Sequence, residues 1–404
     1  MKKYVSLYVH IPFCVVKCKY CDFLSFDGES YGTMLRYVDC LCQEIKMYAP
    51  IVADYGVRSI FIGGGTPSLL DESLITNIMA FIRRYFHVEK NAEVTIEANP
   101  GTLRHQKLNG YKAAGINRIS IGLQSCDDDM LKKLGRIHNF DQFVASYNAA
   151  RRAGFQNINI DIMSGLPGQT IHTYVDTLSR VIEFGPEHIS AYSLSIEEGT
   201  PFAKDPQILN ELPPEMVDRR MYEITKQLLA ATVSVNSSLS TIFCERFTIL
   251  SHWYINFMAI IDIIILAAFG LGASSYFQGK RFNNMRDIFK YIELMENLSD
   301  KFVETDNMEL LYNDTTRTLR ENVTNIYIDA RMEEFMFLGL RMTCGVSRED
   351  FKERFNKDIY EVYGSVLNKY IGEGFMASEG DRIYLTDAGI DVSNVILADF
   401  LLDS

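Results

Sequence analysis

Three cysteines near the N-terminus have a spacing that suits metal chemistry. Cys14, Cys18 and Cys21 lie in "HIPFCVVKCKYCDF" with the pattern CxxxCxxC. Cysteine thiolates bind zinc or the irons of iron–sulfur clusters. A structural zinc takes four ligands and no second cysteine pair follows, although His10 could complete a Cys3His zinc site. Three cysteines on one loop can instead hold three irons of a [4Fe-4S] cube, which leaves the fourth iron open to a chelating ligand.

The composition indicates a globular protein of two parts. With 404 residues, 47% of them hydrophobic and 23% charged, the chain can form a large catalytic domain and a smaller one. Its formal net charge of -12 argues against sequence-blind binding of nucleic acid, which needs a basic surface. The N-terminal apolar run lacks a small-residue cleavage site, so we expect no signal peptide and a cytoplasmic location.

The remaining cysteines are scattered along the chain. In a reducing compartment, clustered cysteines serve a metal site rather than disulfides. Isolated cysteines are most often small buried apolar residues. We therefore expect burial, without a chemical role, for Cys40, Cys42, Cys126, Cys244 and Cys344.

The elements that must position the cysteine cluster alternate along the first half of the chain. Short β-rich runs alternate with longer helical patterns, which predicts an α/β fold: a partial (β/α)6 barrel around a parallel sheet. The predicted strands are residues 4–11, 59–64, 93–99, 118–124, 157–163 and 189–195. Each run ends in a polar or glycine-rich stretch, and these endings should converge on one cavity, because active sites lie at the C-terminal ends of parallel strands.

The second half of the chain has a different pattern. We predict a helix over residues 214–230, then an apolar stretch at 252–270 that is short for a membrane span and contains Asp262. From about residue 285 the pattern is helical, and residues 376–390 look like a two-stranded wing. We predict a first domain over 1–284 and a mostly helical, winged-helix-like C-terminal domain over 285–404. That domain has no basic stripe, so we interpret it as a lid or docking module.

The glycine-rich stretch "GGGTPS", residues 63–68, follows the second predicted strand. It is not a phosphate-binding P-loop, because no Gly-Lys-Ser/Thr ends it. Three glycines expose backbone groups to close approach by a ligand, and a simple tight turn is the alternative.

A CxxxCxxC motif after the first strand of a βα barrel resembles the radical S-adenosylmethionine (SAM) superfamily. The resemblance implies a [4Fe-4S] cluster and bound S-adenosylmethionine, whose sulfonium takes an electron from the reduced cluster and is cleaved to methionine and a 5′-deoxyadenosyl radical. It also implies that Tyr20 packs near the adenine and that the glycines after the second strand meet the amino group of S-adenosylmethionine. Packing within the loop is the alternative for Tyr20.

A longer set of motifs narrows this resemblance. "YVHIPFCxxxCxYCDF", "GGGTPS", "IEANPG", "GINRISIGLQS", "LGRIHN", "DIMSGLPGQT", "SLSIEEGTPF" and "MEEFMFLGLR" are similar to the oxygen-independent coproporphyrinogen III oxidase-like family, over about residues 4–230 and 269–404. The S-adenosylmethionine contacts that the resemblance implies are Tyr8, Gly64, Gly65, Thr66, Glu97, Gln124, Arg136 and Asp161.

Within that family the chain resembles the haem chaperone branch more than the oxidases. The oxidases carry a longer N-terminal arm and a further Gly and Cys after the third cysteine, whereas here 13 residues precede Cys14, and Asp22 and Phe23 follow Cys21. The resemblance implies haem binding and delivery of haem to an unidentified acceptor protein. One form of this delivery is peripheral contact with haemoproteins of the membrane. The alternative is a radical oxidoreductase that acts on a porphyrinogen.

Residues 232–267 differ from the sequence expected in the haem chaperone branch. An "R-H-N-L-x-Y-W" motif, whose histidine is a candidate haem ligand, is expected before "GFGxGA", yet here only His252, Trp253 and residues 269–275 echo the pattern. We hypothesise that part of residues 232–267 is read out of frame, because codons for Phe247 to Leu250 can spell His-Asn-Leu in another frame. Resequencing the gene tests this. His252 is then either a haem ligand or a packed structural histidine.

Overall fold

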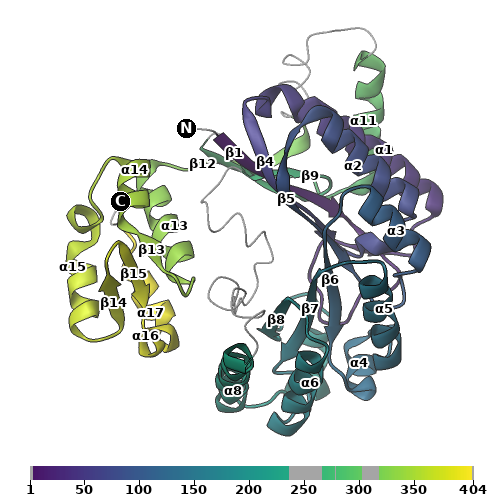
Figure 1. Cartoon of the computed structure of the whole chain (residues 1–404). Helices are drawn as coiled ribbons and strands as arrows, with labels where there is room; N and C mark the ends of the chain where they lie inside the picture. Colours follow the sequence, from purple (N-terminus) through teal and green to yellow (C-terminus); the bar gives the residue numbers. More distant parts are fainter. Residues whose placement is uncertain (1–2, 236–265, 278, 303–317, 403–404) are drawn as a thin grey trace.

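The computed structural model describes residues 3–235, 266–277, 279–302 and 318–402. The hypothesis of a changed reading frame falls mainly on residues 236–265, so it lies outside the described residues, as do His252, Trp253 and Cys244. The described residues form a curved ten-stranded sheet covered by helices, and a smaller C-terminal unit beside it (Figure 1). No helix among them is long and apolar enough to cross a lipid bilayer.

The predicted parallel sheet is confirmed, and it is larger than expected. Its strand order is β12-β11-β10-β9-β1-β4-β5-β6-β7-β8. The six predicted strands correspond to β1 (Lys3–Ile11), β4 (Tyr55–Gly64), β5 (His87–Ala98), β6 (Arg118–Gln124), β7 (Asn157–Ser164) and β8 (His188–Ser193). A further strand, β9 (Leu266–Phe269), pairs in parallel with the other edge of β1.

The central parallel strands β6 and β7 are buried on both faces, but the two faces differ in chemistry. In β6 every residue is buried; Ile119, Ile121 and Leu123 belong to the hydrophobic core, whereas Arg118 and Ser120 form polar contacts with β5 and β7. Side chains alternate across a strand, so the apolar set packs against helices while the polar set faces the barrel interior. The interior is therefore polar and can bind a polar ligand.

The helices between these strands cover the outside of the sheet (Figure 1). Several begin at side-chain caps: Ser30 accepts from Thr33 N, while Asn139 and Thr170 form capping boxes. The predicted helix near 214–230 is confirmed as α8. The helices are α1 (Tyr31–Tyr48), α2 (Glu72–Tyr85), α3 (His105–Ala113), α4 (Asp128–Leu134), α5 (Phe140–Arg152), α6 (Ile171–Glu183), α7 (Pro206–Asn210) and α8 (Glu215–Val235).

Three antiparallel strands extend the sheet beyond β9, where sequence analysis predicted none. They are β10 (Ser274–Phe277), β11 (Lys280–Asn284) and β12 (Arg320–Asn325), and α11 (Ile288–Phe302) lies between the last two in sequence. Apolar residues of α11 join the core of the barrel, as does Leu319. The division of the chain after residue 284 stays a prediction, but the core of the barrel includes segments beyond it.

The C-terminal unit has a core of its own, formed by residues between Met332 and Phe400. Its wing is confirmed: β14 (Met376–Glu379) and β15 (Arg382–Leu385) pair antiparallel, and β13 (Val346–Ser347) joins β15. The helices are α13 (Ile328–Leu340), α14 (Arg348–Phe355), α15 (Ile359–Gly372), α16 (Asp387–Asp391) and α17 (Ser393–Ala398).

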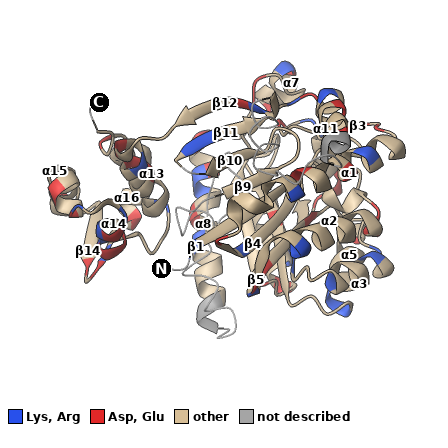
Figure 2. Cartoon of the chain, turned by 90° about the horizontal axis from the view of Figure 1, so that it is seen from above, with Lys and Arg blue, Asp and Glu red and all other residues tan. Residues whose placement is uncertain are grey.

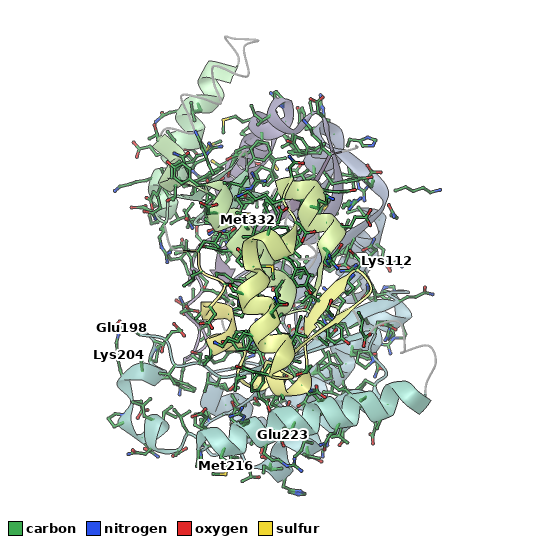
Figure 3. All side chains as sticks on the ribbon, turned by 90° about the vertical axis from the view of Figure 1, so that its left-hand side faces the viewer. Lys112, Glu198, Lys204, Met216, Glu223 and Met332 are labelled. Carbon is green, nitrogen blue, oxygen red and sulfur yellow. The ribbon has the colours of Figure 1, made fainter. Side chains whose placement is uncertain are left out.

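Ionic contacts join the C-terminal unit to the barrel at two places. Lys226 of α8 lies 2.5 Å from Asp387, and Arg281 of β11 lies 3.0 Å from Glu334 of α13. Figure 3 shows the unit above α8, which carries the labelled Met216 and Glu223. Basic and acidic residues both occur over the described part of the chain (Figure 2).

Candidate functional site

The C-terminal ends of the parallel strands border one cavity of about 1170 Å³, which includes its opening to solvent. All the predicted site residues except Tyr8 line it. They are Cys14, Cys18, Tyr20, Cys21, Gly64, Gly65, Thr66, Glu97, Gln124, Arg136 and Asp161. The expected convergence of the strand endings is thus observed, while the chemical role of each residue stays a prediction.

Cys14 ends β2 (Phe13–Cys14), and Cys18 and Cys21 lie on the loop between β2 and β3 (Phe26–Asp27). The Thr66 hydroxyl donates to Cys14 Sγ at 3.6 Å, and Arg136 Nη1 donates to Cys18 Sγ at 3.5 Å. Burial raises the pKa of the Cys14 thiol and raises that of Cys21 to about 12. Metal binding must therefore displace the proton of a buried thiol, as thiolate ligation requires.

The scattered cysteines differ from the cluster in exposure. Cys40, Cys42 and Cys126 are buried, as predicted, whereas the cluster cysteines are half-buried and face the cavity. The expectation for Cys344 was wrong, because this residue is exposed.

His10 lies beneath the cysteine loop. Its Nε2 donates to the Leu24 carbonyl at 2.8 Å, and its Nδ1 accepts from the Tyr8 hydroxyl at 2.9 Å, so both ring nitrogens are engaged. Burial lowers its pKa to about 4, which keeps the ring neutral. No three His, Cys, Asp or Glu side chains of the described residues are placed to hold a single metal ion. His10 is thus bonded within the fold, and the Cys3His zinc site stays an alternative that these contacts do not test.

Tyr8 lies outside the cavity lining. Its ring stacks on Phe61 with centroids 6.3 Å apart, and its hydroxyl is bonded to His10. It supports the histidine that holds the end of the cysteine loop, and its contact with S-adenosylmethionine stays a prediction.

The glycines after β4 make room for the cysteine loop itself. Gly64 has φ +116°, and a Cβ on Gly65 would lie 2.8 Å from the Phe13 carbonyl oxygen and 3.0 Å from Cys14 Sγ. Both positions therefore exclude a side chain. From the sequence, close approach by a ligand and a simple tight turn were both open; in the structure, contacts within the protein already exclude a side chain at both positions.

Two carboxylates face the cavity from neighbouring regions of the sheet. Glu97 accepts a hydrogen bond from Gly64 N at 3.0 Å, and Asp161 accepts from Ser120 Oγ at 3.1 Å and Asn159 Nδ2 at 2.7 Å. Burial, and then the negative charge of Asp161, raise the pKa of Glu97 to about 8. A ligand ammonium beside Glu97 would stabilise its ionised form.

Arg136 supplies positive charge to the same cavity. Its Nη2 donates to Asn99 Oδ1 at 2.8 Å and to the Gly122 carbonyl oxygen, while its Nε is buried and has no partner in the part of the chain that the structure describes. Asn99 in turn donates to Thr66 Oγ1 at 3.0 Å. The sequence analysis placed Asn99 at a strand end but did not single it out, although its position after Glu97 was the available signal.

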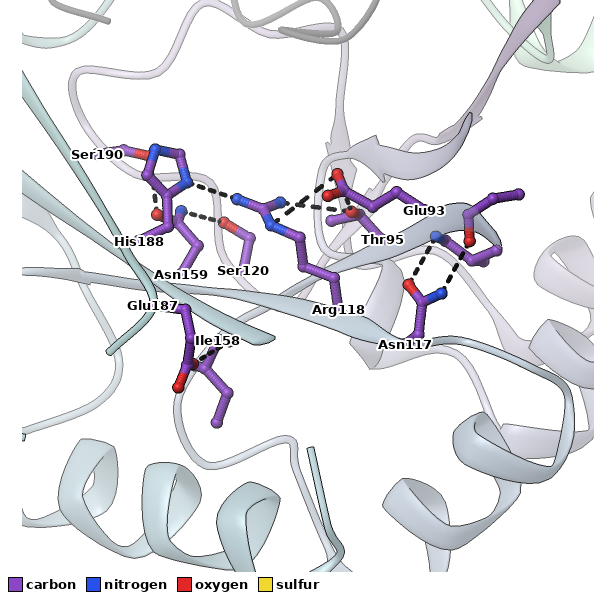
Figure 4. A network of polar contacts seen from close by, with 12 residues as sticks. Glu93, Thr95, Asn117, Arg118, Ser120, Ile158, Asn159, Glu187, His188 and Ser190 are labelled. Atoms are coloured by element: carbon purple, nitrogen blue, oxygen red, sulfur yellow. Dashed lines mark hydrogen bonds and ion pairs between the residues drawn. The ribbon is translucent and has the colours of Figure 1, made fainter. Parts of the chain in front are cut away.

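A second polar network lies deeper in the barrel (Figure 4). Arg118 is buried, donates to Thr95 Oγ1 at 3.3 Å and lies 2.6 Å from His188 Nδ1, so it connects β5, β6 and β8. Near these residues, Asn159 donates to Ser120 at 2.8 Å, and Ser120 donates to the cavity residue Asp161 at 3.1 Å. These contacts were not predicted from the sequence. The pattern that could have predicted them is polar residues at alternate positions of otherwise apolar strands.

These residues fit the cofactors that the sequence predicted. Three half-buried thiols on one loop match a cluster with three protein ligands. Two carboxylates, a guanidinium and an amide match the ammonium, carboxylate and hydroxyl groups of S-adenosylmethionine. The glycines bring the loop and the β4 backbone into contact, which leaves the cavity open beside the thiols.

Known protein families match two parts of the chain. The family described as the radical SAM superfamily matches residues 8–181, and the HemN C-terminal domain matches residues 329–392. The solved structure of coproporphyrinogen III oxidase (HemN) from Escherichia coli superposes with a TM-score of 0.77 and 21% identity, covering 99% of this chain and 90% of that one. At that identity the likeness shows the fold alone.

Sequence relatives define the family more closely. The heme chaperone HemW of Bacillus subtilis (strain 168) is 33% identical over 401 residues, which cover 98% of this chain and 99% of the relative. HemW of Lactococcus lactis is 30% identical, with 100% and 99% of the two chains covered. The similarity thus extends over both the barrel and the C-terminal unit. The chain therefore belongs to the heme chaperone HemW family of radical SAM proteins.

Proposed function

We propose that this protein is a haem chaperone, which binds a [4Fe-4S] cluster, S-adenosylmethionine and haem and passes haem to an acceptor protein. The observation that carries the proposal is the cavity itself, in a chain whose full length resembles heme chaperones. Its place of action is the cytoplasm. Its acceptors include haemoproteins at the membrane surface.

Each group of cavity residues has a part in this proposal. Cys14, Cys18 and Cys21 hold the cluster, which when bound and reduced supplies an electron to the sulfonium of S-adenosylmethionine. Glu97 accepts hydrogen bonds from the ligand ammonium, Asp161 accepts from ribose hydroxyls, and Tyr20 packs against the adenine. Gly64, Gly65, Thr66, Gln124 and Arg136 complete the S-adenosylmethionine site, and Tyr8 supports it from beneath the cysteine loop.

The electrostatics of the cavity support this assignment. Glu97 and Asp161 repel each other when both are ionised, which contributes to the raised pKa of Glu97. A bound cationic ligand relieves that repulsion, because it places positive charge between two carboxylates. The cavity therefore favours a ligand that carries an ammonium and a sulfonium.

The haem site lies partly outside the described residues. His252 is the candidate haem ligand in residues 232–267, and resequencing the gene decides whether this stretch is genuine. If the nucleotides are right and a product of this length is made, the stretch is a true divergence. If the frame is restored by the corrected sequence, the histidine of the restored motif replaces His252 as the candidate.

The experiment that tests the proposal is made without oxygen. The chain is reconstituted with iron and sulfide, its iron is counted, and haem and coproporphyrinogen III are titrated separately with S-adenosylmethionine present. We expect about four irons per chain, a shift of the haem Soret band and no decarboxylated product. A Cys14→Ala variant should lose most of its iron, whereas Cys344→Ala, which changes an exposed cysteine away from the loop, should keep it.

Other outcomes would change the conclusion. Decarboxylated product without retained haem would make the protein an oxidase, the activity named for the structural neighbour. Zinc in place of iron would exclude both functions. A complete cluster without haem binding would locate the defect in residues 232–267.

A further inference from the structure

A chain of hydrogen bonds runs beside the cysteine loop, from the sulfur of Cys14 to the sulfur of Cys18. The Thr66 hydroxyl lies 3.6 Å from Cys14 Sγ, and Asn99 Nδ2 donates to Thr66 Oγ1 at 3.0 Å. Asn99 Oδ1 accepts from Arg136 Nη2 at 2.8 Å, and Arg136 Nη1 donates to Cys18 Sγ at 3.5 Å. Asn99, in the middle of the chain, is thus connected to two of the three predicted cluster ligands.

The guanidinium end of this chain fixes the direction of the bonds that follow it. A guanidinium has donors and no acceptor, so the atom of Asn99 that faces Arg136 is the amide oxygen. The amide nitrogen then faces Thr66 and donates to its hydroxyl oxygen. Because that oxygen accepts from Asn99, its one hydrogen points to Cys14 Sγ, and a thiolate there can only accept it.

Both ends of the chain are held by further contacts. Thr66 is buried, and its backbone N–H donates to the Phe13 carbonyl oxygen at 2.8 Å. Arg136 Nη2 donates its second hydrogen to the Gly122 carbonyl oxygen, which fixes the plane of the guanidinium. The hydroxyl and the guanidinium therefore approach the two sulfurs from fixed positions.

Donors at these sulfurs have a predictable effect on a bound cluster. The reduction potential of an iron–sulfur cluster depends on hydrogen bonds to its sulfurs and on nearby charge. Reduction adds one electron and makes the cluster more negative, so a donor or a cation stabilises the reduced form more than the oxidised form. The Thr66 hydroxyl and the Arg136 guanidinium should both raise the potential.

We propose that Asn99 is a positioning residue for the cluster, which fixes the Thr66 hydroxyl as a donor to the Cys14 sulfur and thereby raises the reduction potential. The inference rests on the proposed binding of a [4Fe-4S] cluster, and it requires neither S-adenosylmethionine nor haem. Asn99 acts through Thr66, so its effect should depend on the presence of that hydroxyl.

The test uses the full-length chain, reconstituted without oxygen and with no S-adenosylmethionine or haem added. Electron paramagnetic resonance gives the ratio of reduced to oxidised cluster at a fixed solution potential, with dithionite as the electron donor. Thr66→Val keeps the shape of the side chain and loses the hydroxyl. Asn99→Asp can still accept from Arg136, but its carboxylate cannot donate to Thr66. The control is Thr177→Val, which removes a buried hydroxyl that accepts from Cys126 N at 3.2 Å, outside the cavity lining.

We expect Thr66→Val to lower the ratio of reduced to oxidised cluster roughly 10-fold, the size of one hydrogen bond to a charged group, or about 59 mV for a one-electron couple. Thr66→Ser, which keeps the hydroxyl, and Thr177→Val should leave the ratio unchanged. In an Asn99→Asp background, Thr66→Val should cause no further fall, because the hydroxyl there already donates to the carboxylate. The added negative charge is common to both chains of that comparison, so it cancels.

Equal falls in the two backgrounds would overturn the inference, because the hydroxyl would then reach the sulfur without Asn99. No fall in either background would overturn it as well. Asn99→Ala adds no charge and keeps the hydroxyl, so it carries the test alone if Thr66→Val takes up no iron. The ratio should fall in Asn99→Ala, and an unchanged ratio would contradict the proposal.

Failure of the proposed function gives a different result. In that case the unchanged chain would hold no reducible cluster after reconstitution, and no ratio could be measured for any variant. A reducible cluster in a chain that binds no haem would leave this inference open to the same comparison of variants, because the measurement uses the cluster alone. Iron counts that match the unchanged chain show that a variant's shift in potential does not come from partial loading.

Discussion

Asn284 of β11 donates a hydrogen bond to the buried carboxylate of Glu44 on α1, at 2.7 Å and across 240 residues of sequence. The same carboxylate accepts from Gly270 N at 2.9 Å and from the Tyr291 hydroxyl at 2.6 Å. Segments on both sides of β10 and β11 are thus joined to the first helix. Residues around β9, β11 and α11 consequently belong to the same core as the N-terminal half of the chain.

Replacing Glu44 by Ala should strongly destabilise the protein. The change leaves three buried donors without an acceptor, and each costs about 1–3 kcal/mol, so we expect the free energy of unfolding to fall by about 3 kcal/mol or more. Urea denaturation measures it. Glu293→Gln on the exposed face of α11 is the control and should change little. A loss below about 1 kcal/mol for Glu44→Ala would mean that water replaces the carboxylate.

Replacing Gly65 by Ala should damage the cysteine loop. The added Cβ would lie 2.8 Å from the Phe13 carbonyl oxygen and 3.0 Å from Cys14 Sγ, so the first cluster ligand must move. We expect the variant to fold but to retain less than about half of the iron after reconstitution. The matched control is Gly372→Ala in α15, where a Cβ meets no atom within 4 Å. Full iron content in Gly65→Ala would show that the loop adapts.

The stability of the cofactor-free chain should depend on the proton of Glu97. Its pKa is raised from 4.5 to about 8, so between these values the folded chain holds a proton that the unfolded chain has released. The free energy of unfolding therefore falls as the pH rises through this window and is level above it. In Glu97→Gln this contribution is absent, because the amide does not titrate.

The measurement for this prediction is the difference in unfolding free energy between the unchanged chain and Glu97→Gln. The stability of the unchanged chain relative to the variant should decrease from below the window to above it. The variant's amide oxygen can still accept from Gly64 N, which makes it a suitable comparison. A difference that is independent of pH would contradict the raised pKa.

The ion pair between Lys226 and Asp387 should contribute little to stability. The side chains are 36% and 87% exposed, and exposed pairs contribute about 0–1 kcal/mol. We expect Lys226→Gln to change the free energy of unfolding by less than about 0.5 kcal/mol, with Lys290→Gln in α11 as a control. A larger loss would show that this pair fixes the C-terminal unit on α8.

Sequence reasoning predicted the parallel strands well because their apolar runs are long and end in distinctive polar stretches. It missed β10 to β12 because these strands are short, and β12 in particular is mostly exposed and polar. It also missed Asn99, whose importance depends on which side chains it meets across the sheet. The residue pattern within one strand does not show which side chains of the neighbouring strands its residues will meet.

Tyr8 was named as an S-adenosylmethionine contact by the family resemblance, and that contact stays a prediction. The sequence did not show that its hydroxyl bonds to His10, two residues along the same strand. The cysteines could be identified from spacing alone, because three thiols on one short loop are close in space whatever the rest of the fold does.

The parallel pairing of β1 with β9 has a consequence for how the protein is made. Ser6–Val9 leave the ribosome first, but their partners on one side, Leu266–Phe269, are synthesised late. Until then the backbone of β1 presents an unpaired edge in the middle of the future sheet, where another chain can pair with it. A product that terminates before residue 266, as an out-of-frame stretch can cause, would keep that edge permanently, and we expect it to be recovered as aggregate.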